Sequence, residues 1–258
     1  MPRIRFSSLE LLLAFDGSSV EFPPGYRTKV DRYWAKINQE GRFFNGPVLS
    51  ASSIPNENED SVVPMQLTDY AHYLYAAQDN AHEYDCRAVF SAAVILTRDD
   101  HLLLGQMSPH TSAPSQIQCP GGGIELDLDG KLDAKLCCQR EVIEELGPDF
   151  GRELVQYEPL CIKSGGELST VGIFYAMRLD VTAEQAHHSF SRHRAAQRAA
   201  GERPEFDCLH TVKFERQVMA EFVQTNRDHL VDYLAPLFLD GWQDVFEATV
   251  FPLMPRSF

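Results

Sequence analysis

The middle of the chain contains runs of apolar residues that have the length of β-strands. The first of them, AVFSAAVILT at residues 88–97, ends at the polar turn 98–100. Short apolar runs that are rich in β-branched and aromatic residues and end at turn residues indicate buried strands. The same pattern recurs at 101–107, 154–163, 170–179 and 209–214. We therefore predict a central sheet built from these five segments.

Other segments repeat their apolar residues with the period of an α-helix. Residues 26–38 show this spacing. Thr182 is a candidate N-cap for a helix over 182–200, and Pro236 would end a helix over 216–235. Together with the strands, these helices predict an α/β protein in which a mixed β-sheet is sandwiched between helices.

The beginning of the chain carries a weaker pattern. Segments 4–15 and 19–22 flank Asp16-Gly17-Ser18, which is a turn signal. This arrangement predicts a hairpin or a pair of edge strands.

Two further strands and a short helix are predicted before residue 80. They are 48–54, 61–66 and 69–77, the last with Thr68 as its N-cap. We interpret residues 1–80 as a small N-terminal α/β extension packed on a core domain at 81–258, and the aromatic residues at 237–254 as packing on that core or on a partner subunit.

The strongest chemical signal is CPGGGIELDLDGKLDAKLCCQREVIEELG at 119–147. Glu141, Glu144 and Glu145 are spaced so that a helix would carry all three carboxylates on one face. Like charges at this spacing destabilise a helix by roughly 0.2–0.5 kcal/mol per pair, and Arg140 alone does not neutralise three of them. A hard divalent cation that prefers oxygen ligands would do so, and Mg²⁺ is the first candidate.

A glycine run precedes this helix, and glycine lets a backbone approach a ligand closely. Residues 120–125 read PGGGIE and residues 140–147 read REVIEELG. The two segments resemble the Nudix box, G-x5-E-x7-R-E-U-x-E-E-x-G-U, where U is apolar. Leu132 stands at the position of the first glutamate, the loop 126–131 is longer than usual, and Pro148 takes the last position.

In this family the first glutamate braces the geometry of the loop and the helix. Asp129 and Asp133 are candidates to replace it in this chain.

The resemblance implies a Nudix fold, best supported over 88–235, and a pyrophosphohydrolase. Such an enzyme hydrolyses a nucleoside diphosphate linked to another moiety. The residues that it implies are Glu141, Glu144 and Glu145 as ligands of Mg²⁺, or of Mn²⁺ in its place, Gly121, Gly122 and Gly123 as contacts to the substrate, with a Gly122 carbonyl as a further metal ligand, and Arg140 as the partner of the carboxylates.

The family often uses one more acid from outside the box as a metal ligand or base. Glu205, just before a late strand, is the first choice, and Glu167 is the second; Glu141 is the alternative base. Arg192 and His110 are candidates for substrate contact. For each of these residues the competing interpretation is an ordinary solvated side chain.

The segment from the tryptophan-containing helix to LTDY resembles a Nudix branch that acts on UDP- or GDP-hexoses, so a nucleotide sugar is the favoured substrate. ADP-ribose, dinucleotides and oxidised nucleotides are alternatives. Two other functions compete with hydrolysis. One is a nucleotide sensor without catalysis, which Leu132 would suit, and the other is isomerisation of a prenyl diphosphate.

Composition narrows the partners. The net charge of −14 argues against nucleic acid and anionic membranes, and no apolar run reaches membrane-spanning length. No two of the six cysteines show zinc-ligand spacing, which favours free thiols in the cytoplasm. The expected partner is a small nucleotide, and the family often forms homodimers.

Overall fold

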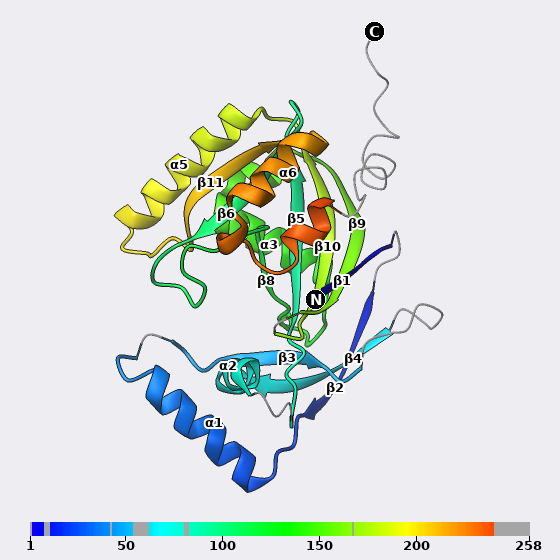
Figure 1. Cartoon of the computed structure of the whole chain (residues 1–258), viewed down its shortest axis with the longest axis vertical. Helices are drawn as coiled ribbons and strands as arrows, with labels where there is room; N and C mark the ends of the chain where they lie inside the picture. The colour runs from blue at the N-terminus through cyan, green and yellow to red at the C-terminus, as the bar shows by residue number, and fades with distance from the viewer. Residues whose placement is uncertain are drawn as a thin grey trace.

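A computed structural model describes residues 2–7, 11–41, 43–53, 62–79, 83–166 and 168–239. The main sheet and its helices form the upper part of the molecule in Figure 1, and a smaller sheet with two helices forms the lower part. Within the described residues, no helix is long and apolar enough to cross a membrane.

The main sheet is mixed. Its strands are β1 (Pro2–Phe6), β5 (Val89–Leu96), β6 (His101–Met107), β7 (Ile117–Gln118), β8 (Gly121–Gly123), β9 (Leu154–Gly165), β10 (Val171–Leu179) and β11 (Phe206–Lys213). Within the described residues they are ordered β1-β9-β10-β5-β6-β11, with β7 beside β6 and β8 beside β5. β10 and β5 are parallel, whereas the other pairs are antiparallel.

Helices cover both faces of this sheet. They are α3 (Ala134–Leu146), α4 (Pro148–Arg152) and α5 (Ala183–Ala199) on one face, and α6 (Arg216–Thr225) and α7 (Leu234–Leu239) on the other. The side chains of β5 alternate between two apolar clusters: Ala93 and Ile95 pack with α3–α5, and Ala92, Val94 and Leu96 pack with α6 and α7. This alternation is the period of two that a strand buried on both faces requires.

The smaller sheet comes from the extension. Its strands are β2 (Leu12–Ser19), β3 (Pro47–Ala51) and β4 (Val62–Asp69), in the order β2-β4-β3. Leu49, Ala51, Val63 and Met65 join the apolar cluster under α3, so the two sheets share one core.

Two helices complete the extension. α1 (Pro24–Ile37) and α2 (Tyr70–Gln78) pack together through an aromatic cluster that contains Tyr26 and Tyr75. The prediction of an α/β fold with a mixed sheet between helices and a small N-terminal α/β unit is confirmed. The division of the chain at residue 80 stays a prediction. β1, although it comes before residue 80, belongs to the main sheet.

The predicted hairpin around Asp16-Gly17-Ser18 is wrong. β2 runs through this segment and pairs in parallel with β4, and its register shifts between Phe15 and Ser19. Gly17 has φ +88°, and Asp16 Oδ1 accepts the Ser18 amide at 2.9 Å. The turn residues therefore form an irregularity inside a strand and do not reverse the chain.

Two helix ends also differ from the predictions. Asp69 caps α2 in place of Thr68, because its side chain accepts the His72 amide at 2.9 Å. The predicted helix 216–235 ends at Thr225, and Pro236 lies in the first turn of α7, where a missing N–H costs nothing. The prediction for 237–254 concerns a segment of which the structure describes only 237–239.

Candidate active site

Helix α3 carries the candidate carboxylates, and both of its ends are fixed. At the start, Asp133 Oδ1 accepts the Leu136 amide at 2.9 Å as an N-cap. At the end, Gly147 adopts φ +116°, and His193 of α5 hydrogen-bonds through Nε2 to the Glu144 carbonyl at 2.9 Å. Because both ends are held, the cap and α5 fix the position of the helix that carries the carboxylates.

The glycine run lies against this helix as the short strand β8, which pairs with β5. Gly121 has φ +151°, and a Cβ on it would lie 2.1 Å from the Ser91 carbonyl oxygen. A Cβ on Gly122 would lie 2.6 Å from the carboxylate of Glu141. Glycine is therefore required at Gly121, where a Cβ would meet backbone, whereas a Cβ at Gly122 would displace the carboxylate of a candidate catalytic group.

Glu145 is the buried member of the cluster. Its Oε2 accepts the Gly121 amide at 2.8 Å, whereas its Oε1 is buried and has no hydrogen-bond partner among the described residues. Burial raises the pKa of Glu145 well above its ordinary value, and the charges of Glu205 and Glu141 raise it further. A buried carboxylate oxygen without a partner is costly unless something positive binds it.

Glu141 is half-buried beside it. Burial and then the charge of Glu144 raise its pKa from 4.5 to about 7, although Arg140 opposes the shift. The Arg140 guanidinium lies 2.8 Å from Glu125, 3.5 Å from Glu141 and 3.7 Å from Glu144. One guanidinium thus contacts three carboxylates, and no described hydrogen bond joins Arg140 to Glu145.

Glu205 reaches the cluster from another part of the chain, at the start of β11. Ser108, at the end of β6, donates its amide to the Glu205 carbonyl and its hydroxyl to the Pro204 carbonyl, both at 2.8 Å. The side chain of Glu205 lies at the surface, but loss of part of its water shell and the charge of Glu144 raise its pKa. The structure therefore brings Glu205 into the same electrostatic cluster as the glutamates of α3.

The donor set suits a hard divalent cation. It offers carboxylate oxygens, one of them buried and unpartnered on Glu145, and such oxygens are the ligands that Mg²⁺ and Mn²⁺ prefer. As the side chains lie, no group of three or more histidine, cysteine, aspartate or glutamate residues among those described is close enough to hold a metal. Arg140 contacts Glu141 and Glu144, and the Gly121 amide contacts Glu145.

The structure also places the remaining candidates. Arg192 of α5 forms an ion pair with Asp149 of α4, so its predicted contact with the substrate would compete with this pair. His110 is half-buried in the loop after β6, and no described contact ties it to the carboxylates. Glu167 lies outside the described residues. Asp133 caps α3, which occupies its side chain.

The sequence reasoning missed Ser108 and His193, which position Glu205 and the end of α3. Neither residue has a local signal, because each acts on a group far along the chain. It also missed the direct contact of Glu125 with Arg140. The signal for that contact was the occurrence of PGGGIE, which ends in Glu125, upstream of a helix that contains Arg140.

No protein-family model matches the sequence, and no curated protein matches it. Several solved structures resemble the fold at low identity. A bifunctional NMN adenylyltransferase/ADP ribose pyrophosphatase from Francisella tularensis, in complex with AMP and a manganese ion, is 12% identical with a TM-score of 0.39, and the match covers 67% of this chain and 46% of that one, less than half its length.

Two further neighbours are matched over most of their length. A protein from Deinococcus radiodurans is 17% identical with a TM-score of 0.41, over 69% of this chain and 90% of that one. A Nudix hydrolase from Nitrosomonas europaea is 14% identical with a TM-score of 0.35, over 62% and 89%. At these identities and TM-scores the likeness assigns no activity to this chain.

Proposed function

We propose that this chain is a Nudix-type pyrophosphohydrolase that cleaves the diphosphate of a nucleoside diphosphate linked to another moiety. The observation that carries the proposal is the position of Glu145 against the glycine strand, where it accepts the Gly121 amide and keeps one buried oxygen without a partner among the described residues. The charges of Glu141, Glu144 and Glu205 act on this buried carboxylate as well. So much uncompensated negative charge is costly in a protein that binds no cation there. The box-like spacing of the sequence supports the same conclusion.

The reaction is the attack of water on a phosphorus atom, with cleavage of the bridging P–O bond and release of two phosphate monoesters. A divalent cation held by the glutamates of α3 would neutralise phosphate charge. Glu141 is the proposed base for the proton of the attacking water, because its carboxylate lies beside the glycine strand and next to the other glutamates of α3. Arg140 keeps the neighbouring carboxylates in place.

A nucleotide sugar, a UDP- or GDP-hexose, is the proposed substrate class. Its support is the resemblance of the N-terminal segment to the nucleotide-sugar branch. We propose a cytoplasmic location, which is supported by the six cysteines, all free thiols in the described residues.

The test is a screen for Mg²⁺-dependent release of phosphate monoesters from nucleotide sugars, ADP-ribose, dinucleotides and nucleoside triphosphates. We expect turnover with the nucleotide sugars and none in EDTA. Glu144→Gln should weaken Mg²⁺ binding by about tenfold or more while the fold is kept. Glu205→Gln should slow turnover more than it raises KM.

Nucleotide binding without turnover of any compound would replace the enzyme by a sensor. Unchanged activity of Glu144→Gln would remove the metal assignment.

A further inference from the structure

The loop 126–132, longer than the box allows, is a compact hairpin-like turn. The Asp127 amide donates to the Lys131 carbonyl at 3.0 Å, and Asp127 Oδ1 accepts the Lys131 amide at 2.7 Å. Leu126 and Leu132 form an antiparallel β-bridge at its base. The turn is therefore held by its own bonds and presents a fixed surface.

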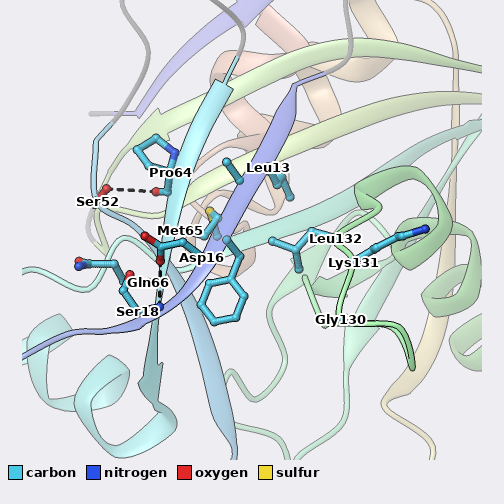
Figure 2. A pocket seen from close by; sticks show the side chains of 12 residues that line it. Leu13, Asp16, Ser18, Ser52, Pro64, Met65, Gln66, Gly130, Lys131 and Leu132 are labelled. Atoms are coloured by element: carbon cyan, nitrogen blue, oxygen red, sulfur yellow. Dashed lines mark hydrogen bonds between the residues drawn. The ribbon is translucent and has the colours of Figure 1, made fainter.

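That surface forms one wall of a cavity of about 690 Å³, and the other walls come from the small sheet of the extension. Figure 2 shows the lining side chains, with Leu132 directed toward β2 and β4. The lining residues are Leu13, Ala14, Phe15, Asp16 and Ser18 of β2, Pro64, Met65 and Gln66 of β4, Ser52 after β3, and Gly130, Lys131 and Leu132 of the loop. A cavity of this size lies within the range of small-molecule sites.

The lining combines flat apolar surface with a few polar groups. Phe15 and Leu132, which are partly buried, supply the apolar surface, and Met65 belongs to the core behind them. Gln66 offers an amide that both donates and accepts, whereas the Ser52 hydroxyl donates to the Pro64 carbonyl at 3.2 Å and is left to accept. This mixture suits a heteroaromatic ring that carries hydrogen-bonding edges better than it suits a bare sugar, which has no apolar face of comparable extent.

The charges of the lining, one carboxylate and one amine, do not favour phosphate. Asp16 is the carboxylate in the wall, and the amine of Lys131 points away from the strands of the small sheet (Figure 2). An anionic group placed there would meet a negative charge without a facing cation. The occupant is therefore the neutral part of a ligand.

The cavity and the carboxylates lie at two ends of one short segment. Gly122 contacts Glu141, and Leu126, four residues later, bridges to Leu132 in the cavity wall. Four residues span at most about 14 Å when extended. Between them, Glu125 bonds to Arg140. A nucleoside diphosphate is long enough to bridge such a separation.

We infer that this cavity binds the nucleoside of the substrate, so that the extension and the lengthened loop together select the base. This inference rests on the proposed function for the position of the diphosphate. It gives both departures from the box-like core, the extension and the loop, one shared purpose.

The test fills the cavity. Ala14→Phe places a ring in it from an exposed position of an edge strand, where an aromatic residue is tolerated. The matched control is Leu128→Ser, which changes a fully exposed residue of the same loop that does not line the cavity. Circular dichroism and the Tm establish that both variants fold.

Binding is measured without metal, by saturation-transfer NMR with free uridine, guanosine, adenosine, cytidine and methyl glucoside. We expect at least one nucleoside to bind to the wild type and to Leu128→Ser and not to Ala14→Phe. In the hydrolysis assay, Ala14→Phe should raise KM by about tenfold or more with kcat nearly unchanged, because the ring removes contacts that the ground state and the transition state share.

The inference is overturned if no nucleoside binds, if nucleoside binding survives in Ala14→Phe, or if only methyl glucoside binds. The failure of the proposed function looks different. In that case nucleosides would bind to the wild type and to Leu128→Ser but not to Ala14→Phe, as expected. No nucleotide, however, would be hydrolysed with Mg²⁺.

Discussion

Replacing Glu141 by glutamine should change how the stability of the metal-free protein depends on pH. In the folded protein the pKa of Glu141 is raised from 4.5 to about 7, and only 18% of the side chain is exposed. The native state therefore keeps a proton that the unfolded chain has lost between these two values. The stability from this group is fully present below pH 4.5 and is lost as the pH rises through 7.

The size of the effect follows from the shift. Each pKa unit corresponds to about 1.4 kcal/mol, so the wild type should lose about 3 kcal/mol that the glutamine variant does not lose. The unfolding free energy of Glu141→Gln minus that of the wild type should thus rise by about 3 kcal/mol from pH 4 to pH 8. Urea unfolding in EDTA, at intervals of half a pH unit, measures this difference.

Glu158→Gln is the matched control. Glu158 is exposed on β9, away from the cluster, and a surface substitution of this kind usually changes stability by less than about 0.5 kcal/mol. A difference for Glu141→Gln that is flat with pH, or that falls as the pH rises, would refute the burial of this carboxyl among like charges. In a separate measurement at pH 8, added Mg²⁺ should stabilise the wild type more than Glu141→Gln, because a ligand that binds the native state adds to its stability.

Other substitutions test the backbone around the site. Gly121→Ala should destabilise the protein by about 3 kcal/mol or more in urea unfolding, because the new methyl group meets backbone. Gly122→Ala should push the Glu141 carboxylate aside and lower Mg²⁺ affinity about tenfold by calorimetry, whereas Gly123→Ala, whose methyl group meets nothing within 4 Å, should leave it unchanged. Thr182→Ala should cost about 1 kcal/mol of stability through loss of the capping box of α5.

The sequence predicted the parts of the fold whose signals are local. The strand β5 and the helix α5 with its Thr182 cap were predicted because apolar period and capping residues act within a few positions. The helix that carries Glu141 and Glu145 was predicted from the spacing of its glutamates and from the resemblance of the segment to the Nudix box.

The parts that were not predicted depend on distant contacts. Asp16-Gly17-Ser18 has the composition of a turn, but β2 finds its partner β4 some fifty positions away, and pairing with that strand overrides the local preference. The fixing of α3 by His193 and the placement of Glu205 by Ser108 are likewise contacts between remote segments. The cavity beside the loop 126–132 could be found only after the small sheet and that loop were placed in space.

The pairing of β1 with β9 has a practical consequence for anyone who wishes to isolate the main sheet with its helices. Residues Pro2–Phe6 lie along Cys161–Gly165 and hydrogen-bond the outer side of that strand. A truncated protein that starts at residue 81 would leave the amides and carbonyls on the outer edge of β9 unpaired. Such an exposed edge strand promotes aggregation. A workable version would graft that opening pentapeptide back beside β9, for example by circular permutation.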